Sequence, residues 1–521
     1  MSNGLPPRWT WRTVDELASL VEYGTSAKTN ESSGGVAVIR MGNITDGKLK
    51  VDSLKYLPAR HAEFPKLLLE PGDVLFNRTN SAELVGKSAV YKGVPAPCSY
   101  ASYLIRVRLR TGCLPDYLAY FINSGFGRTW IKSVVSQQVG QANVNGSKLR
   151  ALCVPAAPLK EQRRIVDAIE QHFSDIDAGV TSLKRVLANV KRYRASVLKA
   201  ACEGRLVPTE AALAKKEMRD YEPANVLLQR ILGERRSRWE AGQLAKMKAK
   251  GQEARDDRWK AKYQETSIPE RGALPGLPKG WCWGRLGTIS EVQLGQQRAP
   301  IHAAAEKPYP YVRAANITWK GLDLTDVNHM GFPNPARYRL EPGDVLLAEA
   351  SGSPSEVGKP AIWRGEIPGA CYQKTLLRVR SLSMDLSPEW LHLGFLRDAV
   401  SGRFAKMAPG VGIVHLTAER MLEWPIALPP RVEQNRIVIE VARILSLTDD
   451  LERAARTQLA RAARLRQSVL KRAFEGKLVP QDQSDEPASA LLEDVRSQQH
   501  VVPPLKPRLT KRSEIASKEV R

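Results

Sequence analysis

A long internal repeat constrains this chain more than any other feature of its sequence. Residues 192–208 read RYRASVLKAACEGRLVP, and residues 464–480 read RLRQSVLKRAFEGKLVP. The similarity extends far upstream, because LEPGDVL stands at 69–75 and again at 340–346. Self-similarity over so long a distance indicates two copies of one structural unit. We therefore expect the 521 residues to form a pseudo-symmetric molecule with two similar surfaces.

Each copy begins with a part that is rich in glycine, proline, asparagine and short β-like runs. These front parts cover residues 1–157 and 273–429. In both, a Pro-Gly-Asp turn signal stands directly before an apolar run, as at the start of a strand. Aromatic and apolar stretches within them have the character of helices. The predicted fold class is α+β, with two similar globular domains.

The back part of each copy, residues 158–208 and 430–480, has the apolar spacing of a long helix. Apolar residues recur every three or four positions, which is typical of a seam that packs on another helix. Each segment ends with a glycine and, a few residues later, a proline, as expected of a helix C-terminus. The first seam consists of Ile165, Ile169, Phe173, Ile176, Val180, Leu183, Leu187, Val190 and Val197, with one interruption at Arg194. The second, less regular seam consists of Ile437, Val441, Leu445, Leu451, Leu459 and Val469.

Two similar seams in one chain are natural partners, because both are present at high effective concentration. We predict an antiparallel coiled coil formed by the two long helices. The alternative is that each apolar stripe packs on its own globular domain.

Two further segments connect or follow the copies. Residues 209–272 are highly charged and are predicted to form a helical extension and linker, in which Trp239, Trp259 and Tyr263 are interleaved with basic residues. Such a segment could contact nucleic acid, but a charged run of this kind is more often a solvated helix face. Residues 481–521 form a C-terminal extension that we expect to be partly disordered.

The overall charge favours a polyanionic partner. The formal net charge is +24, although 43% hydrophobic and 26% charged residues are ordinary values for a globular protein. The six cysteines form no C-x-x-C pair, which fits a reducing cytoplasm and argues against a structural zinc site. We see no secretion signal and no apolar run long enough for a membrane span, so a cytoplasmic location is expected.

A search for catalytic motifs finds none. Gly86-Lys87-Ser88 resembles the end of a phosphate-binding loop, but Ser81 replaces the first glycine that the loop needs. The seven histidines form no H-E-x-x-H motif and no evident ligand cluster. We therefore expect no catalytic residue, no metal and no cofactor on this chain, and we interpret it as a binding protein.

The doubled motifs resemble the specificity subunit of type I restriction–modification systems. The first motif that supports the resemblance is Glu-Gln-x-Arg-Ile-Val, at 161–166 and 433–438. In both copies a proline stands three residues before it. The others are Ser-Val-Leu-Lys with Glu-Gly-(Arg/Lys)-Leu-Val-Pro at the helix ends and Gly-Asp-Val-Leu inside each domain. The resemblance covers about residues 9–480, nearly the whole chain.

The resemblance implies a function in DNA recognition without catalysis on this chain. It implies two target recognition domains that each read one half of a split double-stranded DNA sequence. It also implies that the helices set the distance between the halves and dock two methyltransferase subunits, which use S-adenosylmethionine, and that restriction subunits join, with ATP and Mg²⁺ expected on these partners. Half-sites roughly one helical turn apart, on the order of 35 Å, would suit two surfaces on a spacer. An orphan or regulatory DNA-binding protein of the same fold is the main alternative. A fused nuclease or methyltransferase is a weaker one, because 209–271 is too short and too charged to hold it.

The front domains diverge more than the helices, which favours an asymmetric target. FNRTN at 76–80 stands opposite LAEAS at 347–351. Base reading needs polar side chains on loops that reach the major groove, and the candidate loops are 78–81, 137–145, 351–355 and 406–415. Arg40 and Arg313 recur in both copies, so we expect them to hold phosphate or the fold. The candidate DNA-binding residues are Arg40, Asn43, Arg78, Asn80, Lys87, Gln137, Gln138, Gln141, Asn143 and Asn145 in the first domain and Arg313, Asn316, Ser351, Ser353, Lys359, Lys406 and His415 in the second.

Overall fold

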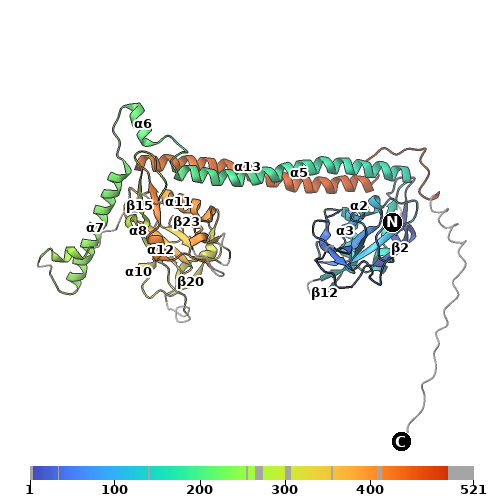
Figure 1. The fold of residues 1–521 in the computed structure, drawn as a ribbon, viewed down its shortest axis with the longest axis horizontal. Helices are drawn as coiled ribbons and strands as arrows, with labels where there is room; N and C mark the ends of the chain where they lie inside the picture. Colours follow the sequence, from blue (N-terminus) through green and yellow to red (C-terminus); the bar gives the residue numbers. More distant parts are fainter. Residues whose placement is uncertain are drawn as a thin grey trace, which may run out of the picture. The chain divides into compact units, whose positions relative to one another are not determined.

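The computed structural model describes residues 4–32, 34–138, 141–253, 256–263, 274–299, 307–351, 353, 356–407 and 414–490. Contacts divide the chain into two compact units (Figure 1). The first unit combines residues 1–183 with 456–521, and the second consists of residues 184–455. Each unit holds one globular domain of strands and helices, together with parts of two long helices. The predicted α+β class is confirmed.

The first domain is organised around the antiparallel sheet β2-β11-β7-β9. A three-stranded sheet, β10-β3-β6, packs beside it, and the pair β1–β14 lies where the first long helix begins. Proline occupies the first turn of α2, where no backbone donor is needed. The strands are β1 (Thr10–Thr13), β2 (Ala18–Tyr23), β3 (Val36–Ile39), β4 (Ile44–Thr45), β5 (Lys48–Leu49), β6 (Lys55–Leu57), β7 (Val74–Asn77), β8 (Thr79–Asn80), β9 (Ser88–Val90), β10 (Cys98–Tyr100), β11 (Leu104–Leu109), β12 (Ser136–Gln138), β13 (Gln141–Asn143) and β14 (Cys153–Ala156). The helices are α1 (Val14–Leu17), α2 (Pro115–Asn123), α3 (Gly125–Val134) and α4 (Gly146–Arg150).

The second domain repeats this topology. Its sheets have the orders β16-β25-β21-β23 and β20-β17-β24, and the pair β15–β27 corresponds to β1–β14. The sequence repeat is therefore a structural repeat. The strands are β15 (Cys282–Arg285), β16 (Ser290–Leu294), β17 (Tyr309–Val312), β18 (Ile317–Thr318), β19 (Gly321–Leu322), β20 (Asn328–Met330), β21 (Val345–Ala348), β22 (Ala350–Ser351), β23 (Pro360–Ile362), β24 (Cys371–Tyr372), β25 (Leu376–Ser381), β26 (Val414–His415) and β27 (Pro425–Leu428). The helices are α8 (Leu286–Ile289), α10 (Pro335–Tyr338), α11 (Pro388–Val400) and α12 (Ala418–Leu422).

Two helices of 44 residues follow the domains, α5 (Leu159–Cys202) and α13 (Arg431–Phe474). In the first unit the beginning of α5 shares a core with the end of α13, where Ile169 and Phe173 join Leu470. In the second unit the end of α5 shares a core with the beginning of α13, where Val197 joins Val441. The beginning of each helix thus pairs with the end of the other, and the predicted antiparallel coiled coil is confirmed (Figure 1). The same residues also pack on the globular domains, so the alternative packing contributes as well.

The inner faces of the helices follow the predicted seams with one exception. Leu451 is 55% exposed, so its prediction as a seam residue is wrong. Thr448 is buried instead, and Arg194 Nε donates to its hydroxyl at 2.9 Å. Arg194 also pairs with Asp449 and Glu452, so a polar layer replaces apolar packing at this point. The other predicted seam residues, Ile165, Ile169, Phe173, Ile176, Val180, Leu183, Leu187, Val190, Val197, Ile437, Val441, Leu445, Leu459 and Val469, are buried or half-buried.

A buried tryptophan–glutamate pair fixes the beginning of each long helix to its own domain. Trp9 Nε1 donates to Glu161 at 3.0 Å, and Trp281 Nε1 donates to Glu433 at 2.8 Å. The glutamine that follows each glutamate accepts a backbone N–H from its domain, Leu114 in the first copy and Ser387 in the second. The repeated Glu-Gln motif is therefore a structural anchor.

The repeated Glu-Gly motif at the helix ends places each end against the domain of the other copy. Gly204 has φ +66°, and a Cβ there would meet Pro278 at 2.5 Å. Gly476 has φ +69°, and a Cβ there would collide with Pro6. Glycine is required at both positions because of its left-handed conformation and the close approach. The end of α5 thus packs at the start of the second domain, and the end of α13 at the start of the first.

The charged segment after α5 forms α6 (Glu210–Glu217), α7 (Ala224–Ala249) and a short 3₁₀ helix, Arg258–Lys262. The first turns of α7 contribute Leu227, Leu228 and Ile231 to the core of the second unit, so this part is not only a linker. Trp239 stacks on Trp259 farther along, with ring centroids 5.8 Å apart. Residues 264–273 and 491–521 lie outside the described residues, and with them most of the predicted C-terminal extension.

Candidate nucleic-acid interface

The two candidate loops of the first domain meet in one small sheet. Strand β8 lies next to β13 and β13 next to β12, in the order β12-β13-β8. In addition, Val144 N donates to Arg78 O at 2.9 Å. This sheet therefore joins loops 78–81 and 137–145, which are far apart in the sequence. Its strand β12 lies on the side of the domain away from α5 and α13 (Figure 1).

Arg78 is held at this sheet by an aromatic side chain. Its guanidinium lies 4.7 Å from the ring centroid of Tyr23, and Nη1 donates to Ser102 O at 3.5 Å. The Tyr23 hydroxyl in turn accepts the N–H of Gly146 at 2.7 Å. Stacking on a ring orients the planar guanidinium and leaves several of its donors available. Arg78 is thus a pre-oriented donor at the end of β7.

The remaining candidates of this sheet have mixed roles. Asn145 caps α4, because its Oδ1 accepts the N–H of Lys148 at 2.9 Å, and Asn80 Oδ1 accepts the N–H of Ser81 at 2.8 Å. Asn143 Oδ1 is buried and has no hydrogen-bond partner within the described part of the chain. Gln141 is exposed. Gln137 and Gln138 belong to β12, but their side chains lie outside the description.

The second domain brings its candidate loops together in the same way. Strand β22 pairs with β26, with Ala350 opposite His415 and Ser351 opposite Val414. Leu416 N donates to Glu349 O at 2.7 Å, which reproduces the bond between Val144 and Arg78.

The other candidates of these loops are described only in part. Ser353 and Lys406 are exposed. The side chain of Ser351 and residues 352, 354–355 and 408–413 lie outside the described residues.

Two asparagines that were predicted to bind DNA have structural roles instead. Asn43 is 4% exposed, accepts the N–H of Arg40 at 2.9 Å and donates to Lys50 O at 2.8 Å. Asn316 is 3% exposed and makes the equivalent bonds with Arg313 N and Asp323 O. Both amides close a turn, as asparagine often does, so we remove them from the candidate interface.

Three of the recurring basic residues are also engaged within the protein. Arg313 pairs with Asp326, and Arg40 Nη2 donates to Ser53 O at 3.3 Å. The side chain of Lys359 is 11% exposed and pairs with Glu356.

Lys87, the equivalent of Lys359, is half-buried. It lines a cavity of the first unit beside Asp46, Glu83 and Arg128. At Arg40, Arg313 and Lys359, repetition in both copies therefore marks contacts that hold the fold.

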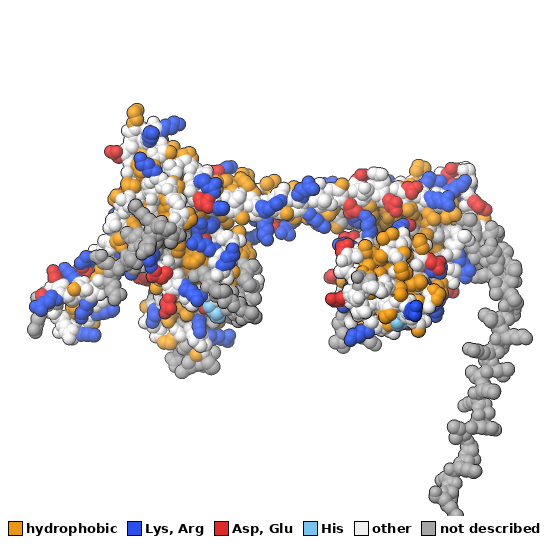
Figure 2. All heavy atoms as spheres, viewed as in Figure 1, with side chains coloured by type: hydrophobic (Ala, Val, Ile, Leu, Met, Phe, Trp, Pro, Cys, Tyr) orange, Lys and Arg blue, Asp and Glu red, His pale blue; other side chains and the backbone are white. Residues whose placement is uncertain are grey.

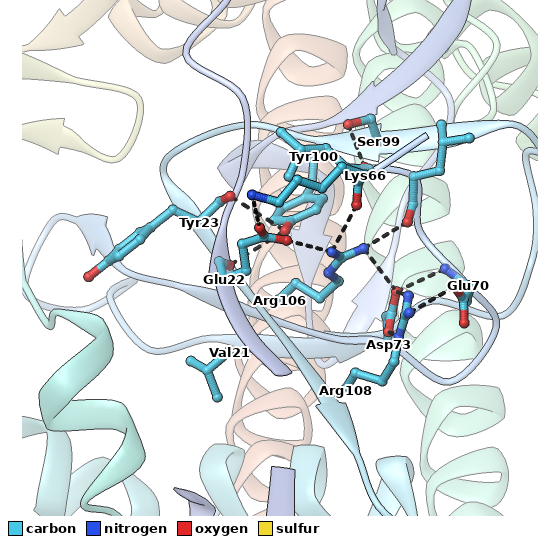
Figure 3. Close-up of polar contacts among 12 residues, drawn as sticks. Val21, Glu22, Tyr23, Lys66, Glu70, Asp73, Ser99, Tyr100, Arg106 and Arg108 are labelled. Atoms are coloured by element: carbon cyan, nitrogen blue, oxygen red, sulfur yellow. Dashed lines mark hydrogen bonds and ion pairs between the residues drawn. The ribbon is translucent and has the colours of Figure 1, made fainter. Parts of the chain in front are cut away.

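The repeated Gly-Asp-Val-Leu motif has a similar explanation. Asp73, at the start of β7, accepts two bonds from Arg108 at 2.8 and 2.9 Å (Figure 3). The neighbouring Arg106 is 2% exposed and donates to Glu22 at 2.6 Å. Burial raises the pKa of Glu22, but hydrogen bonds from Lys66 and Arg106 lower this pKa more, so the carboxyl titrates below its usual range. The motif thus holds the central sheet together.

Within the described residues, no group of three or more His, Cys, Asp and Glu side chains is arranged to hold a metal ion. None of the described helices is long and apolar enough to cross a membrane.

Comparison with known proteins gives one consistent family. Residues 6–185 match the family model of the type I restriction modification DNA specificity domain. The type I restriction enzyme StySPI specificity subunit of Salmonella potsdam is 24% identical over 518 residues, which cover 95% of this chain and 96% of that protein. The first domain therefore matches the type I restriction modification DNA specificity domain, and the chain as a whole is similar to type I specificity subunits over nearly its full length. The EcoKI specificity subunit of Escherichia coli K12 is 30% identical over 223 residues, which cover 42% of this chain and 48% of that protein.

The fold of this chain also has a relative among solved structures. A chain from a structure described as the basis of complex assembly and conformational transition of the type I R-M system aligns with a TM-score of 0.56. The alignment covers 91% of this chain and 99% of that chain at 22% identity, and shows a common fold.

The structure adds two residues to the candidate interface that the sequence alone did not indicate. Tyr23 orients Arg78 in the first domain. Glu349 occupies the place in the second domain that Arg78 occupies in the first. Glu349 could have been found by aligning the copies, where it stands opposite Arg78.

Proposed function

We propose that this chain is a type I specificity subunit that reads a split, asymmetric DNA sequence, with one recognition domain on each half. The observation that carries the proposal is the pair of equivalent small sheets, β8–β13 and β22–β26, which present different side chains at matching positions. Equivalent surfaces with equal side chains would read equal half-sites. Different side chains at the same places predict unlike half-sites.

The charge of the chain supports binding to double-stranded DNA. A formal net charge of +24 attracts phosphate from any sequence, while the base-reading groups select one. Affinity for the target is therefore expected to fall steeply with salt.

The catalytic steps are assigned to partner subunits. We infer that two methyltransferase subunits dock on the long helices and bring S-adenosylmethionine for methylation of adenine N6, and that restriction subunits bring ATP and Mg²⁺. An exposed apolar groove on the helices of the second unit supports this docking. Its lining includes Tyr193, Leu447 and Leu451, which are 51%, 52% and 55% exposed. Exposed apolar surface of this kind commonly marks a protein interface.

The experiment that tests the proposal compares DNA methylation in the source cell with and without this gene. Loss of one adenine-methylated motif with unlike halves and a fixed spacer is the expected result. Loss of a continuous or palindromic motif would contradict the two-domain reading. An unchanged methylation pattern would favour the orphan or regulatory alternative.

A further inference from the structure

The two recognition domains carry opposite hydrogen-bonding groups at one structurally equivalent position. Arg78 follows β7 and its carbonyl accepts the N–H of Val144; Glu349 follows β21 and its carbonyl accepts the N–H of Leu416. The strand registers give the same match for the opposing strand, where Asn143 faces Thr79 and His415 faces Ala350. A donor in the first domain is thus replaced by an acceptor in the second.

Glu349 forms a pair with His415 at the surface of its domain. His415 Nδ1 lies 2.9 Å from Glu349 Oε1. The His415 side chain is 54% exposed, whereas that of Glu349 is 13% exposed. The carboxylate therefore lies behind the imidazole, and the imidazole faces solvent.

This arrangement selects one tautomer of the neutral imidazole. Because the carboxylate only accepts, its bond with Nδ1 places the single N–H of the neutral ring on that nitrogen. Nε2 of this tautomer carries the lone pair and is a hydrogen-bond acceptor. Arg78, by contrast, offers only donors.

Stability does not account for the pair. The first domain has the same local backbone with Arg78 and Asn143, so the fold does not require a glutamate and a histidine here. The side chains at this place differ between the copies. By contrast, the Asp73–Arg108 bond of the first domain recurs as the Asp344–Arg380 bond of the second.

We propose that the Glu349–His415 pair is the acceptor through which the second recognition domain reads an exocyclic amine in the major groove. The amine is N6 of adenine or N4 of cytosine, the two base donors exposed there. Glu349 is a positioning residue that sets the imidazole tautomer, and His415 contacts the base. The proposal rests on the proposed function, because it names one base contact within the second half-site.

The test measures binding of the complex with its methyltransferase subunits to duplexes that lack single amines. In each duplex one adenine of the second half-site is replaced by nebularine, or one cytosine by 2-pyrimidinone. We expect one such position at which the unaltered protein loses roughly fivefold or more in affinity. His415→Ala, which removes the acceptor, should bind the altered and unaltered duplexes equally at that position.

His329→Ala is the matched control, because His329 is also exposed in the second domain but lies on β20. It should retain the full loss on amine removal. Glu349→Gln should reduce the loss, whereas Arg78→Glu should change only the first half-site.

The inference is overturned if amine removal has no effect anywhere in the second half-site, or if His415→Ala shows the same loss as the unaltered protein. These outcomes would leave a split target intact. Absence of any split target would overturn the proposed function itself, and the inference with it.

Discussion

A buried glutamate begins each long helix, and the two copies differ in the donors that surround it. Glu433 accepts from Trp281 Nε1 and from the N–H of Glu210, one bond for each oxygen, both at 2.8 Å. Glu161 accepts from Trp9 Nε1, but its Oε1 has no partner within the described part of the chain. Burial raises the pKa of both carboxyls, and the hydrogen bonds counter this only in part.

This difference predicts unequal effects of the same substitution. Glu433→Gln places an amide N–H against the N–H of Glu210, so it should lower the free energy of unfolding by about 1–3 kcal/mol. Glu161→Gln keeps an acceptor for Trp9 and should cost less than about 1 kcal/mol. Urea unfolding followed by circular dichroism measures both. Equal losses would contradict this account of the two sites.

Asp177 should make the first unit sensitive to acid. Burial raises the pKa of Asp177, but hydrogen bonds from Lys48 and Arg466 lower this pKa more, and the net shift is downward. Because the folded pKa lies below the unfolded value of about 3.9, the ionised group stabilises the fold above about pH 4. That contribution is lost as the pH falls through the folded pKa.

Asp177→Asn should therefore lower the melting temperature at pH 7, and its difference from the unaltered protein should shrink below about pH 4. Asp175→Asn, on the same helix, is the control and should have little effect at any pH. A difference for Asp177→Asn that persists unchanged at pH 3 would exclude the pairing as its cause.

At the scale of elements, the long helices were the most predictable part of the molecule. Their apolar spacing and the glycines at their ends are signals that lie within short stretches of sequence, and both features are found in the structure. Leu451 was mispredicted because the layer of Arg194 and Thr448 depends on a partner helix that the spacing of one helix does not reveal. Asn43 and Asn316 were mispredicted because a buried turn cap and a surface base reader use the same residue type.

The helix ends offer a direct test of backbone requirements. Gly204→Ala and Gly476→Ala each introduce a Cβ at positive φ and against a proline, so each should lower the free energy of unfolding by about 1 kcal/mol or more. Gly233→Ala is the control, because Gly233 lies inside α7 with open space around it. It should raise stability by about 0.5–1 kcal/mol. Chemical denaturation of the three variants distinguishes these outcomes.

The apolar groove on the helices gives a prediction for assembly. Leu447→Glu and Leu451→Glu together should weaken co-purification with the methyltransferase subunit by at least about tenfold, because charges would be buried without partners. Ala442→Glu, at an exposed position of α13 outside the groove, should have no effect. The melting temperature of the free protein should stay unchanged in all variants. Normal co-purification of the double variant would place docking elsewhere.

At the scale of the whole molecule, the duplicated plan predicts that the recognition domains are separable in function. Replacing residues 10–156 with the first domain of a relative should change one half of the methylated motif and leave the other half and the spacer as they were. Adding a heptad to both long helices should lengthen the spacer without changing either half. Sequencing of methylated DNA determines both halves of the motif and the length of the spacer. A change in both halves after one domain exchange would contradict independent reading.

The construction of the first unit from both ends of the chain has a consequence for synthesis. Phe474 lies against Tyr117 and Phe121 in its core, with ring centroids 5.1 Å apart in both pairs. Residues 184–455 form the second unit without any later residue. At about 5–20 residues per second, the ribosome supplies the end of α13 on the order of tens of seconds after the first domain has emerged. The domain that is synthesised first is therefore completed last. Until α13 has been synthesised, the core of this domain lacks Phe474 and is exposed to chaperones and proteases.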